Sequence, residues 1–141
     1  MVEIALTLCV IGIMTAMMIP KIGRVIQANQ VSRSAAIVAA DLERGFTLAG
    51  RYRRPMRLSC TCGTGIYTVA DRTGGTVRLT RNLRADGDLG TMTLTFSQTP
   101  VDVFPSGVVS IAAPPLTVRI TSGVSTRGIT MTTAGQVRIV P

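Results

Sequence analysis

The stretch MVEIALTLCVIGIMTAMMIP, residues 1–20, decides the fold. Nearly all of its side chains are apolar, and Glu3 carries its one charge. At ~1.5 Å of rise per residue, a helix of this length is about as long as the hydrocarbon core of a bilayer is thick. The stretch therefore predicts a membrane-spanning helix. Because an ionised carboxylate is costly in hydrocarbon, Glu3 indicates a functional site that needs a cationic partner.

The remainder of the chain has the composition of one small β-rich domain. The chain has 141 residues, of which 46% are hydrophobic and only 4% are aromatic, with no Trp. Beyond the apolar stretch it is rich in Thr, Val, Ile and Gly, which favour short strands joined by turns. We therefore expect one helix followed by one globular unit with an aliphatic core.

Arginine dominates the charge of the chain. The formal net charge is +8, fourteen of the fifteen basic residues are Arg, and there is no His. This balance favours acidic partners such as nucleic acid or anionic lipid, without choosing among them. The lack of His removes the commonest acid/base group and metal ligand at neutral pH. The acids are scattered, and Asp86 and Asp88 lack the further oxygen ligands of a calcium loop, so a turn is expected there. We expect no enzyme, no cofactor and no metal.

The helical pattern continues beyond Pro20 as an amphipathic segment. Residues 21–54 alternate between apolar and polar positions with a helical period. The polar residues include Arg24, Arg33, Asp41 and Arg44, and the apolar stripe is formed by Ile22, Val25, Ile26, Val31, Ala35, Ile37, Val38 and Leu42. Proline removes a backbone donor and glycine weakens helices. A kink or a locally unwound stretch is therefore expected between the residues Gly12, Pro20 and Gly23.

From Pro55 the pattern changes to a period of two, so we expect the helix to end near Arg51 and strands to follow. The predicted strands cover residues 56–60, 65–70, 76–81, 91–96, 108–111, 116–121, 128–132 and 136–140. Turn signals rich in Gly, Pro and Asp separate them, including Ala85-Asp-Gly-Asp88. The predicted fold class is α+β: a long N-terminal α-helix packed on a C-terminal antiparallel β-sheet domain. The expected divisions are 1–20, 21–54 and 55–141.

The cysteines leave two readings open. Cys60 and Cys62 would point to the same face of an extended strand. A bridge between such close neighbours is strained, and a metal site would need further ligands. Free packed thiols are the preferred interpretation, and a disulfide is the alternative.

The start of the chain differs from an ordinary secretory signal. The first basic residues, Lys21 and Arg24, follow the apolar run instead of preceding it. Taken alone, the positive-inside rule would leave the C-terminal domain in the cytoplasm. A short basic leader that once preceded Met1 and was removed would resolve this contradiction, so we expect the encoded chain to begin upstream.

These features together resemble the N-terminal region of type IV pilins and type II secretion pseudopilins. The resemblance rests on Glu3, the apolar run, Pro20 seventeen residues after the acid, and the amphipathic extension. The segments DLERGFTLAGR (41–51), VFPSG (103–107) and ITMTTAGQVR (129–138) are similar to the GspH/FimT branch of this family. The family usually has its acid at the fifth position of the mature chain, after a peptidase cuts behind a glycine and methylates the new amine. Here it is third, which implies two residues missing from the start.

The resemblance implies a helical filament assembled through the N-terminal helix. Glu3 would pair with the N-terminal amine of a neighbouring subunit, which would set the register. The partners would be copies of the chain or other pilins, the inner membrane before assembly, and the assembly machinery. The predicted location is the inner membrane, then an extracellular pilus or a periplasmic pseudopilus. A plain membrane anchor is the competing reading, although it would need neither Glu3 nor Pro20.

The predicted function is a structural subunit of a type IV pilus-like filament. The alternative is a minor pilin or pseudopilin that acts in type II secretion or in DNA binding and uptake. Exposed cations suffice for phosphate contacts, and the resemblance includes minor pilins that use basic residues near the C-terminus. The residues predicted to contact DNA or another anionic surface are Arg51, Arg53, Arg54, Arg57, Arg119, Arg127 and Arg138.

Overall fold

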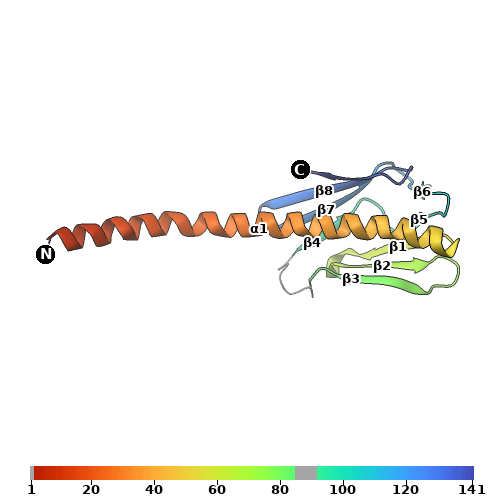
Figure 1. Ribbon diagram of the computed structural model, residues 1–141, viewed down its shortest axis with the longest axis horizontal. Coiled ribbons are helices and arrows are strands. Elements are labelled where there is room, and N and C mark those ends of the chain that lie inside the picture. Colours follow the sequence, from red (N-terminus) through yellow and green to blue (C-terminus); the bar gives the residue numbers. More distant parts are fainter. Residues whose placement is uncertain (1, 85–91) are drawn as a thin grey trace.

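The computed structural model describes residues 2–84 and 92–141, without the side chains of residues 17–21. It consists of one long helix and two antiparallel sheets (Figure 1). The predicted α+β class, a long helix packed on an antiparallel β domain, is confirmed. The predicted turn at Ala85-Asp-Gly-Asp88, with the two aspartates considered for calcium, lies outside the described residues.

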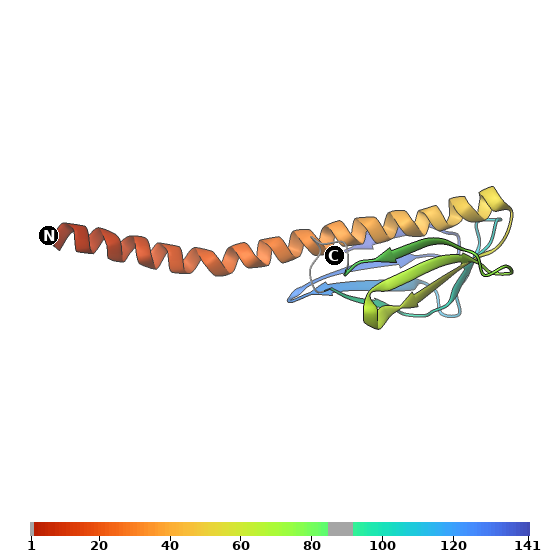
Figure 2. The ribbon, with the colours of Figure 1, turned by 90° about the horizontal axis from the view of Figure 1, so that it is seen from below.

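Helix α1 runs without interruption from Val2 to Tyr52. Of the two alternatives expected between Gly12 and Gly23, a kink or an unwound stretch, the unwound stretch is wrong, since the backbone stays helical through Pro20. A proline removes one donor from a helix, and the bonds on either side can hold the turns together while the axis bends. Figure 2 shows such a change of direction in the part of α1 ahead of the β domain.

Nine strands follow the helix and form two sheets. One sheet has five strands in the order β3-β2-β1-β5-β6, and the other has four in the order β4-β7-β8-β9. Their bounds are β1 Met56–Thr61, β2 Ile66–Asp71, β3 Val77–Asn82, β4 Thr93–Phe96, β5 Val101–Val103, β6 Val109–Ser110, β7 Leu116–Ser122, β8 Ser125–Met131 and β9 Val137–Val140. A short 3-10 helix, η1, spans Cys62–Thr64.

The predicted strands are all present, with two differences. Strand β8 begins at Ser125 instead of Gly128. Its first, polar residues also pair with β7, and the pairing ends with Ser122 opposite Ser125. Strand β5 was not predicted. It has only three residues, Val101–Val103, and a charged one at its centre, so it gives little alternating signal.

The core lies between the two sheets and one face of α1. Helix α1 contacts strands of both sheets, namely β1, β5, β7, β8 and β9, and the sheets lie to either side of it in Figure 1. Strand β7 shows the expected alternation, with Leu116, Val118 and Ile120 buried and Arg119 exposed. The core is aliphatic apart from Tyr67, which is consistent with the low aromatic content of the chain.

Candidate functional site

The N-terminal half of α1 projects from the β domain (Figures 1 and 2), and its described side chains from Val2 to Ile26 are exposed. Its exposed large apolar residues are Val2, Ile4, Leu6, Leu8, Val10, Ile11, Ile13, Met14, Ile22, Val25 and Ile26. Soluble monomers rarely expose so large a contiguous apolar surface, and such surfaces mark contacts with membranes or other proteins. This half of the helix is therefore the first candidate site.

Glu3 lies in the first turn of α1, between the exposed residues Val2 and Ile4. An acid in this position complements the partial positive charge of a helix N-terminus. An added Cβ at Gly12 or Gly23 would meet no heavy atom within 4 Å, so no contact inside the monomer requires glycine at either position.

The predicted membrane span covers residues 1–20, and part of it lies outside the described side chains. Within the part that the structure does describe, no helix is both long enough and apolar enough to cross a membrane.

The C-terminal half of α1 is held on the β domain by small and aliphatic side chains. Its buried residues with essentially no exposure are Val31, Ser34, Ala35, Val38 and Ala49. The first members of the predicted apolar stripe, Ile22, Val25 and Ile26, are exposed, and its members from Val31 to Leu42 are buried or half-buried. The helix begins to cover the sheets near Val31.

Asp41 links α1 to the five-stranded sheet. Its carboxylate accepts hydrogen bonds from the Tyr67 hydroxyl of β2 at 2.6 Å and from Nε and Nη2 of Arg81 on β3 at 2.9 and 3.3 Å. The side chain of Asp41 is 5% exposed and that of Arg81 is 31% exposed. Burial, followed by the bond to Asp41, raises the pKa of Tyr67 above its ordinary range, so the phenol keeps its proton and donates.

The predicted arginines at the end of α1 do not act as one group. Arg54 pairs with buried Asp71 at 3.4 Å, and Arg57 pairs with Asp102 at 2.8 Å. These two cations are used inside the fold. Arg51 is exposed, with its guanidinium 5.9 Å from the centre of the Tyr52 ring.

Arg53 ends the helix in a left-handed conformation, with a φ of 50° that usually favours glycine. Its amide donates to the carbonyl of Gly50, and the amide of Arg54 donates to that of Ala49. These bonds satisfy carbonyls at the end of the helix, and they leave the side chain of Arg53 exposed.

The two carboxylates that bind arginines near this end have lowered pKa values. For Asp71 the main cause is a hydrogen bond from the Thr73 amide, and Gly74 and Arg54 contribute. For Asp102 the main cause is the hydrogen bond from Arg57. Both acids are therefore ionised at neutral pH and act as ties between elements.

The three C-terminal arginines are divided between the two faces of the four-stranded sheet. Arg119 is exposed on β7 opposite Gly128, and Arg138 is exposed on β9 opposite Thr130, both on the face away from the core. Arg127 lies two residues before buried Ile129 on β8, so its side chain is on the core-facing side of the sheet. It lines a hollow with Ala28 and Val31 of α1. The sheet therefore brings together Arg119 and Arg138 and separates Arg127 from them.

Solved structures with this arrangement are known. The minor pilin FimU of type IV pili from Pseudomonas aeruginosa matches with a TM-score of 0.63 and 15% identity, over 80% of this chain and 90% of that one. The minor pseudopilin EpsH from the type 2 secretion system of Vibrio cholerae matches with a TM-score of 0.59 and 16% identity, over 79% and 96% of the two chains. The chain has the type IV pilin fold.

The similarity to these proteins is found in the structure and not in the sequence. No family model matches the sequence, and no curated protein matches it. At these identities the shared feature is the pilin fold itself, with its long helix and antiparallel β domain.

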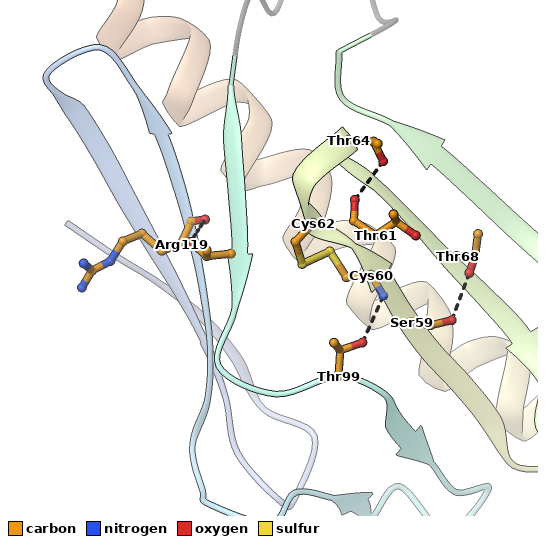
Figure 3. The surroundings of a disulfide bond; sticks show 9 residues. Ser59, Cys60, Thr61, Cys62, Thr64, Thr68, Thr99 and Arg119 are labelled. Carbon is orange, nitrogen blue, oxygen red and sulfur yellow. Dashed lines mark hydrogen bonds between the residues drawn. A yellow bond between two sulfur atoms is a disulfide. The ribbon is translucent and has the colours of Figure 1, made fainter.

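The pilin fold of this chain carries a disulfide between Cys60 and Cys62 (Figure 3). The preferred interpretation of free thiols at these two positions is thus wrong. The extended conformation on which it rested ends at Thr61, and the chain turns into η1 at Cys62, which leaves the two Cα atoms 5.1 Å apart. That separation is within the usual range for a disulfide. The Cys60 amide also donates to the hydroxyl of Thr99 at 3.1 Å, next to the bridge. Cys9 is free and exposed on α1.

The described residues contain no group of three or more His, Cys, Asp or Glu side chains that could hold a metal ion. An open hollow of about 260 Å³ lies over β4 and β7 and is lined by Thr95, Phe96, Ser97, Thr117 and Arg119. Its described lining offers hydroxyls and one cation, and it contains no carboxylate, Cys, His or Lys that could act as a base beside those hydroxyls.

Sequence reasoning missed the role of Asp41, which it placed among the polar residues of the helix. A signal was present, because Asp41 lies three residues after Val38 and one before Leu42, and so falls on the buried face. Its partners Tyr67 and Arg81 are on β2 and β3, and only the sheet order brings them to it.

Proposed function

We propose that this chain is a minor subunit of a type IV pilus-like filament or of a type II secretion pseudopilus. The observation that carries the proposal is the exposed apolar half of α1, which continues directly into a half that is packed on the pilin-fold domain. Burial of apolar area at ~25 cal/mol per Å² makes the exposed half a strong site for helix bundling. The domain is then displayed outside the bundle.

A minor role is favoured over that of a main structural subunit for two reasons. The matched structures are described as a minor pilin and a minor pseudopilin. In addition, a net charge of +8 per subunit would repeat along a filament made of this chain alone, and self-repulsion opposes compact assembly.

In this proposal Glu3 sets the register of the helix. Its exposure in the monomer leaves it available to the N-terminal amine of a neighbouring subunit within an apolar bundle. Removing one partner of a buried ion pair costs about 3–5 kcal/mol, because the other charge stays buried. A subunit docked out of register would incur this cost on both charges.

The test is the substitution Glu3→Ala in cells that express the full chain. Sheared filaments and the membrane fraction are compared by immunoblot, and Glu43→Ala serves as a control at an exposed acid of the same helix. We expect Glu3→Ala to remove the chain from filaments while the membrane pool remains, and Glu43→Ala to do neither. Equal incorporation of both variants would refute the role of Glu3. Absence of the wild-type chain both from sheared filaments and from cross-linked pilin complexes of the cell envelope would refute the proposed function.

Binding of DNA is the second candidate function, favoured by Arg119 and Arg138. Both are exposed on the same face of the four-stranded sheet, and neither pairs with an acid among the described residues. Each phosphate contact contributes a slope of about −0.9 in log affinity against log salt for duplex DNA. Replacing both residues by Ala should reduce this slope by about 2, whereas Arg54→Ala, at a cation already used by Asp71, should not. Unchanged binding in the double variant would exclude this face.

A further inference from the structure

Three exposed arginines follow one side of α1. Arg33, Arg44 and Arg51 are 11 and 7 residues apart, which is close to three and two turns at 3.6 residues per turn. They therefore share one side of the helix over roughly 27 Å at ~1.5 Å per residue. None of the three makes an ion pair among the residues that the structure describes.

Strand β3 places a fourth exposed arginine beside the Arg51 end of this row. The guanidinium of Arg78 lies 4.2 Å from the centre of the Tyr52 ring, and the guanidinium of Arg51 lies 5.9 Å from the same ring. Strand β3 is the outer strand of its sheet, and its Arg81 reaches back to Asp41 on α1. We call the four exposed residues Arg33, Arg44, Arg51 and Arg78 the arginine seam.

The acids near the arginine seam do not neutralise it. Asp41 is buried and is bound by Arg81 and Tyr67. Glu43 is exposed, but its position one residue before Arg44 turns it by about 100° around the helix, away from the seam. Among residues 33–51 of α1, all of which the structure describes, no other carboxylate is present.

The arginine seam continues the exposed apolar side of α1. Ile26 is exposed and precedes Arg33 by seven residues, or about two turns, so the two residues lie on the same side of the helix. A neighbouring helix that packs against Ile26 would extend directly onto the seam. Two copies of this chain that meet through this same side of α1 would place arginine against arginine, which opposes association.

We propose that the arginine seam is the contact surface for a different protein subunit, one that presents carboxylates to Arg33 and Arg44. This inference rests on the proposed function, in which α1 is the element that meets other subunits. Electrostatic complementarity then selects an acidic neighbour over a second copy of the same chain and fixes the register of the contact.

The experiment places a photocrosslinking side chain at Ala40, an exposed position between Arg33 and Arg44, in the full chain expressed in its own cells. Cross-linked partners are identified by mass spectrometry of sheared filaments. We expect an adduct with a different subunit that carries Asp or Glu within about one turn of the attached residue. The double variant Arg33→Glu/Arg44→Glu should lower the yield of this adduct by about five- to thirtyfold.

The matched control is Arg119→Glu/Arg138→Glu, which makes the same charge change on the opposite sheet and should leave the adduct unchanged. Replacing the partner's acids by Arg should restore the adduct with the Arg33→Glu/Arg44→Glu chain, which shows that this variant is folded. An adduct between two copies of the chain would overturn the proposal, and so would a yield that charge reversal does not alter.

Two further outcomes separate this proposal from the one on which it depends. A wild-type chain that enters filaments but cross-links only to nucleic acid or lipid at Ala40 overturns the acidic subunit alone. A wild-type chain found neither in filaments nor in any subunit adduct overturns both the seam and the proposed function.

Discussion

Asp41 should be the acid on which the docking of α1 depends most. Replacing it by Asn keeps the size of the side chain and removes the charge that binds Tyr67 and Arg81. Breaking a buried ion pair costs about 3–5 kcal/mol. Arg81 keeps 31% of its side chain exposed, so water recovers part of this loss, and we expect Asp41→Asn to lower the free energy of unfolding by about 2–4 kcal/mol.

The matched control is Glu43→Gln, which makes the same change of charge on the same helix. Glu43 is exposed and has no ion pair within the described part of the chain. Surface substitutions of this kind usually change stability by less than about 0.5 kcal/mol. The difference between the two variants therefore isolates the bonds made by the buried carboxylate from the general effect of removing a negative charge from a basic protein.

The assay measures the thermal unfolding of the full chain in mild detergent by calorimetry and by circular dichroism. A loss of 2–4 kcal/mol corresponds to a decrease in Tm of roughly 5–15 °C for a domain of this size. Tyr67→Phe should cost less than Asp41→Asn, because Asp41 keeps its bonds to Arg81. Since the two residues share one network, the double variant should cost less than the sum of the single ones. A Tm for Asp41→Asn equal to that of Glu43→Gln would refute the reasoning.

Three further predictions concern the same domain. The folded pKa of Tyr67 is raised above the ordinary tyrosine value of about 10. Its contribution to stability should therefore be complete below about pH 10 and decrease as the pH rises above it, and the alkaline loss should be smaller in Tyr67→Phe when unfolding is titrated with base. The folded pKa values of Asp71 and Asp102 are lowered from 3.8, so the stability that these residues contribute should be present above about pH 4 and lost as the pH falls below it. Asp102→Asn should therefore weaken the dependence of Tm on acid pH. Gly135→Ala should lower the free energy of unfolding by about 2–4 kcal/mol, because φ is 78° and the new Cβ would lie 2.7 Å from the Phe46 ring. Gly75→Ala, at a φ of 64° in open space, should lower it by only about 1 kcal/mol in the same thermal unfolding experiment.

The sequence was sufficient for the long helix and for every strand except β5, because each of these elements has a periodic signal. The apolar residues of α1 recur at helical spacing, and strands such as β7 alternate between Leu116, Val118 and Ile120 inside and polar residues outside. The long helix on an antiparallel domain follows from these two periods. Strand β5 lacked such a signal because its three residues offer a single alternation.

Residues whose role depends on a distant partner could not be placed in the same way. Asp41 was expected among polar positions, and it is buried because β2 and β3 bring Tyr67 and Arg81 to it. Arg54 and Arg57 were grouped with exposed arginines, and both are bound by acids from other elements. The pairing of Cys60 with Cys62 depended on where β1 ends. In each case the missing information was the course of the chain in space.

The distribution of acids connects the fold with its proposed partners. Three of the described acids, Asp41, Asp71 and Asp102, are bound by arginines, and each joins segments that are far apart in the sequence. Their negative charge is therefore unavailable at the surface, whereas the arginine seam and the outer arginines of the four-stranded sheet keep theirs. A basic domain built in this way can fold alone, because exposed charges further apart than about 10 Å are screened by salt. Close packing in a filament removes that screening, so carboxylates supplied by an adjacent subunit would be the most favourable contact for Arg33 and Arg44.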